Sequence, residues 1–164
     1  MSTHLKNLSD FSGTKVPSAA PYHFGIVVAE WNADITEALY MGAYESLLEH
    51  GAMTENIYTH AVPGSFELTT GADILLKNRK LDAVICLGCV IQGETKHFDF
   101  ICNAVANGIT NVALKYSKPV IFGVLTTDNL QQAIDRAGGK YGNKGVEAAV
   151  TAIKMAALAE TLNN

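Results

Sequence analysis

Short apolar runs alternate with amphipathic stretches along most of this chain. The apolar runs predict strands, because each is four to nine residues long, rich in β-branched side chains and bounded by turn residues. The predicted strands cover residues 24–29, 56–62, 83–91 and 120–125. Between and after them, apolar positions recur at helical spacing. We expect helices over residues 34–50, 68–78, 97–116 and 146–162, with a short one opened by residues 126–129 and ending near 137.

This alternation of strand and helix predicts an α/β fold in which a parallel sheet is covered by helices on both faces. Four strands and their helices form a three-layer α/β/α sandwich around a central four-stranded parallel sheet. Each crossover should be right-handed. Ligands of such sheets bind beyond the carboxyl ends of the strands, so we expect functional residues in the loops that follow the strands.

Length and charge narrow the class of protein. The chain has 164 residues, 48% of them hydrophobic, and a formal net charge of −4. This length favours a single domain over residues 22–164, preceded by a polar arm over residues 1–21 that is extended or disordered. The absence of a basic stripe argues against a nucleic-acid partner. No apolar run approaches the ~18 residues of a membrane span, and the polar arm lacks a signal-peptide core, so we expect a cytoplasmic protein.

The three cysteines, Cys86, Cys89 and Cys102, do not indicate a disulfide framework, because their number is odd. Cys86 and Cys89 have the C-x-x-C spacing of redox and zinc sites, but both lie inside a predicted strand and no second ligand pair follows. Reactive pairs of this kind usually open a helix, where the thiol pKa is lowered. We therefore expect buried, inert thiols.

The most informative segment is residues 93–97, Gly-Glu-Thr-Lys-His, which links the most apolar strand to a helix. Backbone N–H groups at a helix N-terminus form a seat for phosphate. His97 at the same edge can accept and donate protons near neutral pH. A cation in the first turn opposes the helix dipole, so stability alone would favour another residue than histidine there. The segment indicates chemistry on a phosphorylated small molecule.

Two other strand ends carry candidate binding residues. Trp31, the only tryptophan, could stack on a flat heteroaromatic ring or could simply cover the core. Asn32 could hydrogen-bond that ring or be the turn residue before the helix. The segment Gly64-Ser65-Phe66-Glu67 repeats the strand–turn–helix pattern. Its amides could bind a carbonyl or hydroxyl, and Glu67 could bind a polyol or merely favour the helix dipole.

Arg136, Lys140 and Lys144 surround a glycine-rich segment, residues 138–145, in a chain with 12 lysines and arginines. Such a cluster is usually a solvated face, but arginine can also bind phosphate through two N–H groups. The segment is not a P-loop, because Tyr141 follows Gly139-Lys140 where serine or threonine is needed. The first strand also lacks the glycine fingerprint of dinucleotide-binding folds.

In this order and spacing, the motifs closely resemble the lumazine synthase family, over residues 24–157. The phrases that carry the resemblance are Val62-Pro63-Gly64-Ser65-Phe66-Glu67-Leu68, Gly93-Glu94-Thr95-Lys96-His97-Phe98, Phe122-Gly123-Val124-Leu125-Thr126-Thr127, Ala133-Ile134-Asp135-Arg136-Ala137-Gly138 and Gly142-Asn143-Lys144-Gly145. The resemblance implies a flavodoxin-like sheet and a transferase of riboflavin biosynthesis. It would condense 5-amino-6-(D-ribitylamino)uracil with 3,4-dihydroxy-2-butanone 4-phosphate, releasing phosphate and water without cofactor or metal.

The resemblance also implies a role for each candidate residue. Trp31 would stack on the pyrimidine, where the family more often has phenylalanine, and His97 would transfer protons. The ribityl chain and ring edge would be held by Asn32, Gly64, Ser65, Phe66, Glu67, Val90 and Ile91. The phosphate would lie on Gly93, Glu94 and Thr95, joined by Arg136 from a neighbouring subunit, and Phe122 and Lys144 would complete the pocket across that boundary.

Family members form homopentamers, and many assemble into icosahedral shells. The compact turn over residues 138–145 is similar to the shell-forming type, and the N-terminal arm would add a strand to a neighbouring subunit's sheet. A riboflavin synthase is a possible associated partner. Two other interpretations stay open: a flavin-binding electron-transfer protein, which the loop after the first strand disfavours, and a shell protein that has lost activity, which His97 and Arg136 disfavour.

Overall fold

The computed structural model describes residues 7, 9–11, 13 and 15–163 of the chain. Four parallel strands form one sheet in the order β2-β1-β3-β4. They are β1 (Phe24–Ala29), β2 (Ile57–Val62), β3 (Ala83–Ile91) and β4 (Val120–Thr127). The predicted parallel sheet of four strands is therefore confirmed.

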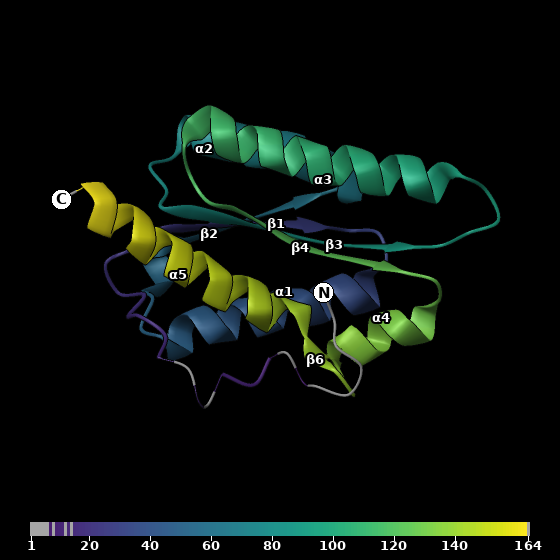
Figure 1. Ribbon diagram of the computed structural model, residues 1–164, viewed down its shortest axis with the longest axis horizontal. Coiled ribbons are helices and arrows are strands. Elements are labelled where there is room, and N and C mark those ends of the chain that lie inside the picture. Colours follow the sequence, from purple (N-terminus) through teal and green to yellow (C-terminus); the bar gives the residue numbers. More distant parts are fainter. Residues whose placement is uncertain (1–6, 8, 12, 14, 164) are drawn as a thin grey trace.

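Helices cover both faces of this sheet, as Figure 1 shows. The helices α1 (Ala33–Glu49) and α5 (Lys144–Asn163) lie together on one face, and α2 (Leu68–Asn78) and α3 (His97–Tyr116) lie together on the other. Side chains of β1 alternate between the two faces: Ile26 belongs to the core under α1 and α5, and Val27 to the core under α2 and α3. The three-layer sandwich follows directly from this alternation.

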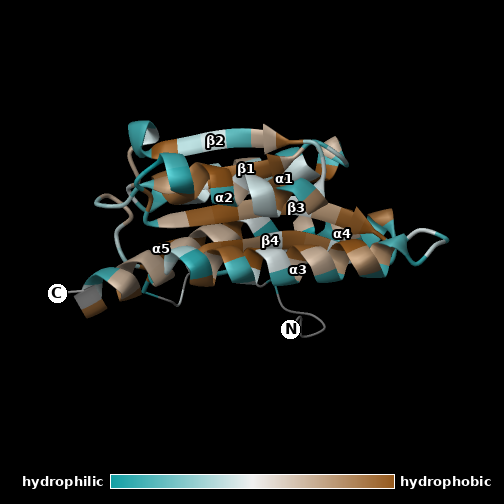
Figure 2. Ribbon diagram, turned by 90° about the horizontal axis from the view of Figure 1, so that it is seen from above, coloured by the Kyte–Doolittle hydropathy of each residue, from teal (hydrophilic) through white to brown (hydrophobic). Residues whose placement is uncertain are grey.

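Strand position explains the apolar pattern of each strand. The first seven residues of β3 are buried, because β3 has strands on both sides and helices on both faces. The edge strand β2 is half-buried or exposed along its length, and Figure 2 shows it more polar than the brown β1 and β3. A continuous apolar run marks an interior parallel strand, whereas an edge strand tolerates polar residues.

The glycine-rich segment folds into a small hairpin, which the sequence analysis did not predict. Its strands β5 (Ala137–Gly139) and β6 (Gly142–Asn143) are antiparallel, and the glycines at 138 and 142 have positive φ angles of 107° and 86°. The hairpin connects the short helix α4 (Leu130–Arg136) to α5. Because Asn143 ends β6, α5 begins at Lys144, two residues before the predicted start.

The predicted boundary between the last strand and α4 is also corrected. Thr126 and Thr127 continue β4, because they pair in register with Val90 and Ile91 of β3. The helix begins only at Leu130, where the Asn129 side chain accepts a hydrogen bond from the Gln132 amide at 3.0 Å. An asparagine N-cap of this kind fixes a helix start.

Asn143 anchors the hairpin to α1. Its Nδ2 donates to the Ala38 carbonyl at 2.9 Å, and its Oδ1 accepts from the Gly145 amide at 2.8 Å. A Cβ atom added to Gly42 would lie 2.6 Å from Cγ of Asn143, and one added to Gly145 would overlap the Leu39 carbonyl. Glycine at both positions thus lets the hairpin and α5 lie against α1.

The described part of the N-terminal segment packs on its own chain. Ala19 is fully buried and its amide donates to the His50 carbonyl at 2.8 Å, while the Tyr22 hydroxyl donates to Glu160 at 2.7 Å. Of the predicted arm, residues 7, 9–11, 13 and 15–21 are described, and among them the Ser9 hydroxyl donates to the Asn143 carbonyl at 2.9 Å; the rest of residues 1–21 lies outside the described residues. Within the part of the chain that the structure describes, no helix combines the length and the apolarity required to cross a membrane.

Candidate active site

The turn after β1 positions Trp31 and Asn32 at the carboxyl edge of the sheet. Backbone bonds from Glu30 and Trp31 to the carbonyls of Val62 and Pro63, at 2.8 and 3.1 Å, tie this turn to the end of β2. Asn32 adopts a left-handed conformation (φ 61°), which asparagine tolerates better than most residues. Its carbonyl accepts the first amide bonds of α1.

The Asn32 side chain also ties this turn to the central strand β3. Its Nδ2 donates to the Cys89 carbonyl at 2.9 Å. One amide hydrogen of Asn32 is thus engaged within the protein, while its Oδ1 has no hydrogen bond among the described residues. Asn32 is therefore the turn residue before α1, and its Oδ1 is also available as a hydrogen-bond acceptor for a ligand.

The indole of Trp31 lies against Gly64 of the next strand end. Trp31 is 67% exposed, and a Cβ atom added to Gly64 would lie 2.7 Å from Cε3 of its ring. Phe66, two residues after Gly64, is 54% exposed. The edge therefore presents two accessible aromatic rings, which the sequence alone could not distinguish from core residues.

Ser65 and Glu67 are oriented by their local structure. The Gly64 amide donates to Oε2 of Glu67 at 3.0 Å, which closes the turn and leaves Oε1 without a described partner. Ser65 is buried, and its hydroxyl lies against Gly88, where an added Cβ atom would be 2.6 Å from Oγ. Gly64 thus lies against Trp31 and Glu67 bonds the Gly64 amide, whereas the Ser65 hydroxyl packs on β3.

The segment between β3 and α3 is open. Residues 92–97 are all exposed, and this segment projects past the sheet at the right of Figure 1. The His97 amide donates to Oγ1 of Thr95 at 3.4 Å, and nothing lies within 4 Å of a Cβ atom added to Gly93. Among the described residues, the His97 imidazole has no hydrogen-bond or ion-pair partner. Its ring is therefore accessible to a ligand at the start of α3.

Arg136 and Lys144 meet at a carboxylate that the sequence analysis did not single out. Glu147 accepts from Nη2 of Arg136 at 2.9 Å and from Nζ of Lys144 at 3.2 Å, and its side chain is only 12% exposed. Nη1 of Arg136 has no partner among the described residues. The i,i+3 spacing of Lys144 and Glu147 on one helix was the available signal.

Lys140 does not join this cluster of Arg136, Lys144 and Glu147. Its ammonium lies 5.1 Å from the centre of the Tyr141 ring. No described contact connects the cluster to Trp31, Glu94 or His97 within this chain. The structure thus describes an aromatic group and a basic group, each at the carboxyl side of the sheet, without contact between them.

The strand residues of the predicted site are partly buried. Val90, Ile91 and Phe122 are half-buried and pack on the core. Thr127, next to Ile91 in the sheet, was missed by the sequence analysis; it is buried and its Oγ1 has no described partner. A threonine at the end of an apolar strand was the only signal for it.

The cysteines behave as expected for structural thiols. Burial raises the pKa of Cys86 to about 12 and that of Cys89 to about 11, so both remain protonated at neutral pH. Cys102 is a free thiol on α3, and burial raises its pKa too. In the described residues, no group of three or more histidine, cysteine or acidic side chains could hold a metal ion.

Exposed aromatic rings, an accessible imidazole at a helix start and a half-buried basic pair, all at the carboxyl side of a parallel sheet, are typical of one class of protein: a three-layer α/β enzyme that acts on small molecules. The family model for 6,7-dimethyl-8-ribityllumazine synthase matches residues 21–160. The chain belongs to this family, and it is an enzyme of riboflavin biosynthesis. The resemblance seen in the sequence motifs is therefore confirmed.

Individual relatives match over 82–100% of their own length. The 6,7-dimethyl-8-ribityllumazine synthase of Cytophaga hutchinsonii is 64% identical over 99% of this chain and 100% of its own. That of Parabacteroides distasonis is 57% identical over 94% of this chain and 97% of its own. That of Flavobacterium johnsoniae is 54% identical over 95% of this chain and 82% of its own.

Proposed function

We propose that this site condenses 5-amino-6-(D-ribitylamino)uracil with 3,4-dihydroxy-2-butanone 4-phosphate. The observation that carries the proposal is the placement of the Trp31 indole and the His97 imidazole, both accessible, in loops that follow neighbouring strands. The indole offers a stacking surface for the uracil ring, and the segment before His97 offers amides for a phosphate.

The pyrimidine substrate would bind over the turn from Gly64 to Glu67. Stacking on Trp31 would orient the ring, and the exposed Phe66 would offer a second apolar surface. Oε1 of Glu67 and the backbone of Ser65 can bind ribityl hydroxyls. Oδ1 of Asn32 and the backbone of Val90 and Ile91 would contact the ring edge.

The phosphorylated ketone would bind in the segment before α3. The amides of Gly93, Glu94 and Thr95 would hold its phosphate, with the Glu94 carboxylate turned away. Nη1 of Arg136 has no described partner but is buried, so the side chain would turn outward to donate to the same phosphate. Because Arg136 makes no described contact with this segment in its own chain, we assign it, with Phe122 and Lys144, to the site of a neighbouring subunit.

The chemistry requires proton transfers but no strong electrophile. The substrate amine attacks the ketone carbonyl and forms a Schiff base with loss of water; phosphate is then eliminated, and ring closure releases a second water. Holding the substrates together supplies most of the rate. His97 would accept and return protons during these steps and add roughly 10²-fold or more.

We further propose that the chain acts as a homopentamer, within an icosahedral shell, in the cytoplasm. Its surface supports an assembly: Phe100 and Leu114 on α3 are 72% and 73% exposed, and Ile74 on α2 is 55% exposed. Apolar side chains grouped on one helical layer commonly mark an interface. The N-terminal arm would add a strand at an exposed edge of a neighbouring sheet, and association with a riboflavin synthase remains part of this proposal.

The direct test mixes the purified protein with both substrates and follows the fluorescence of the product, while light scattering gives the particle mass. Turnover by an assembly of pentamers is expected. If the protein is folded but shows no turnover, the proposed reaction is contradicted. If a monomer is active, the proposal that a neighbouring subunit completes the site is contradicted.

Two variants separate the proposed roles. His97→Ala should keep measurable turnover with a kcat reduced by about 10² or more, since proximity remains. His60→Ala, an exposed histidine on β2, is the matched control. Complete loss in a folded assembly argues against the proximity account, and an unchanged kcat argues against proton transfer by His97.

Arg136→Ala should raise KM for the phosphorylated ketone and leave KM for the pyrimidine nearly unchanged. Lys140→Ala removes a nearby cation that does not contact Glu147, and therefore serves as its control. Equal saturation of Arg136→Ala and wild type by the ketone would remove Arg136 from the phosphate site.

A further inference from the structure

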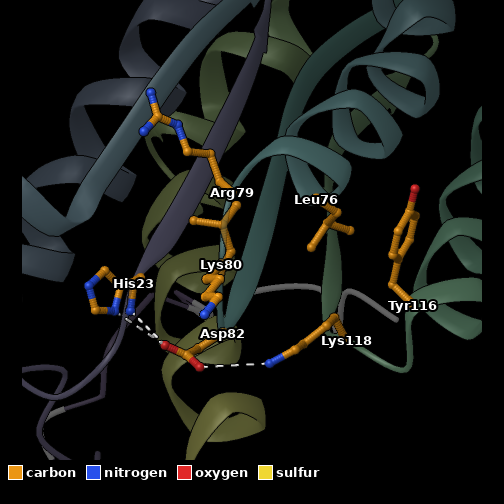
Figure 3. Close-up of a pocket in the computed structure, with 8 residues that line it drawn as sticks. His23, Leu76, Arg79, Lys80, Asp82, Tyr116 and Lys118 are labelled. Carbon is orange, nitrogen blue, oxygen red and sulfur yellow. Dashed lines mark hydrogen bonds and ion pairs between the residues drawn. The ribbon is translucent and has the colours of Figure 1, made fainter.

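A cavity lies at the opposite edge of the sheet from the candidate active site. Its volume is about 480 Å³, which is within the range of small-ligand sites. Its lining comes from residues that precede strands: His23 before β1, Asp82 before β3 and Lys118 before β4. Figure 3 shows these side chains converging beside Arg79 and Lys80, which follow α2.

The cavity carries an excess of positive charge. Asp82 is the only acidic residue of its lining, opposed by Arg79, Lys80 and Lys118. Because the Arg79 side chain stacks on Tyr58, Lys80 and Lys118 leave one fixed positive charge over Asp82 in the cavity, in a chain whose net charge is −4. This concentration of cations distinguishes the cavity from the acidic protein as a whole, and it favours an anionic ligand.

Asp82 is already engaged by its neighbours. Its Oδ2 accepts from the His23 amide at 2.8 Å and lies 3.7 Å from Nδ1 of the same residue, and its Oδ1 lies 3.8 Å from Nζ of Lys118. Lys80 has no hydrogen bond or ion pair within the described part of the chain. The Asp82 carboxylate therefore orients the Lys118 ammonium, whereas the positive charge of Lys80 is not balanced by an ion pair.

The Lys118–Asp82 pair is easily rearranged by a ligand. It is long, and the two side chains are 42% and 36% exposed, so the pair contributes little to stability. A phosphate carries about two negative charges and three acceptor oxygens at neutral pH. It can accept hydrogen bonds from both Lys80 and Lys118 without leaving either ammonium desolvated and unpaired.

The other side of the cavity is an apolar wall, in which a hydrogen bond fixes the aromatic ring. Leu76 and the buried Leu81 form part of it, together with the Tyr116 ring. The Tyr116 hydroxyl donates to Asp73 at 3.2 Å, which fixes the ring. Arg79 extends away from Asp82 in Figure 3, and its guanidinium lies 4.9 Å from the centre of the Tyr58 ring.

We propose that this cavity binds a small organic phosphate, with the phosphate between Lys80 and Lys118 and the organic part over Leu76 and Tyr116. The site is separate from the candidate active site. The two lie at opposite ends of β3, whose nine residues span roughly 30 Å.

Isothermal titration calorimetry with phenyl phosphate and inorganic phosphate tests the proposal. All proteins carry Arg136→Ala, which weakens the other phosphate site. One preparation adds Lys80→Ala and Lys118→Ala, and the matched control adds Lys15→Ala and Lys154→Ala, which remove the same charge elsewhere. Circular dichroism verifies that each folds.

We expect phenyl phosphate to bind at least about tenfold more weakly after removal of Lys80 and Lys118, and unchanged in the control, because both ammonium groups that would contact the phosphate are then gone. Inorganic phosphate should bind more weakly than phenyl phosphate to the parent protein. Unchanged binding without Lys80 and Lys118, or equal losses in both preparations, overturns the site. Equal affinity for the two probes overturns the role of the apolar wall.

Discussion

Gly64→Ala should reduce the use of the pyrimidine substrate by displacing the Trp31 ring. The backbone at Gly64 is extended (φ −140°, ψ 177°), a conformation that alanine also adopts. The added Cβ atom, however, would lie 2.7 and 2.9 Å from Cε3 and Cζ3 of Trp31. Favourable carbon contacts are about 3.5–4.0 Å long, so the ring must move by roughly 1 Å.

The expected rise in KM for the pyrimidine can be estimated from the free energy that aromatic stacking contributes to binding. Aromatic pairs contribute about 0.5–1.5 kcal/mol beyond the area that they bury, which corresponds to about 2- to 13-fold in KM for the pyrimidine. Trp31 is 67% exposed, so it can move without disrupting the core. We therefore expect the free energy of unfolding to change little and KM for the phosphorylated ketone to stay the same.

The assay combines steady-state kinetics with intrinsic fluorescence. Trp31 is the only tryptophan, so its emission reports directly on the ring. A double-mutant cycle with Trp31→Ala isolates the contact, because Gly64→Ala should have no further effect once the indole is gone. A Gly64→Ala penalty of the same size in the Trp31→Ala background would refute the reasoning, and so would an equal rise of both KM values.

Three other measurements test the core, the N-terminal segment and the thiols. Leu87→Ala removes a fully buried side chain from the central strand and should lower the free energy of unfolding by about 2–5 kcal/mol in urea denaturation; a loss well under this range would mean that the core closes around the gap. The hydrogen bond to Glu160 raises the pKa of Tyr22 to about 12, so the unfolded chain ionises first and stability should fall between pH 10 and 12. Tyr22→Phe should remove this part of the pH dependence, and an identical slope in the variant would contradict it. Cys86 and Cys89, with pKa values of about 12 and 11, should resist a thiol reagent at pH 8 until the protein unfolds; rapid labelling of the native protein would contradict their burial.

The order of strands and helices was predictable from the sequence because each element has a clear apolar period and a turn residue at its end. The strand from Ala83 to Ile91 matches its predicted bounds, as does the helix from His97 to Tyr116. The hairpin around Gly138 and Gly142 was not predictable, because glycines that permit a positive φ in a hairpin look the same as those of an irregular loop.

The candidate site was predictable as a set of strand ends but not as a set of contacts. Parallel strands bring their carboxyl ends to one edge, so Trp31, Gly64 and His97 were expected on that side. The seating of the indole on Gly64 is a contact between two separate loops, and no local pattern encodes it. Glu147 was missed for the same reason, since Arg136 lies eleven residues away on another helix.

The fit of Asn143 into the space beside Gly42 links two positions that are distant in sequence. A methyl group at position 42 needs a smaller residue at 143, and that exchange removes the amide that ties β6 to Ala38. A substitution at only one of these two positions would weaken the contact between α1 and the hairpin that follows Arg136. In a comparison of many homologues, these two positions should therefore change as a pair or not at all.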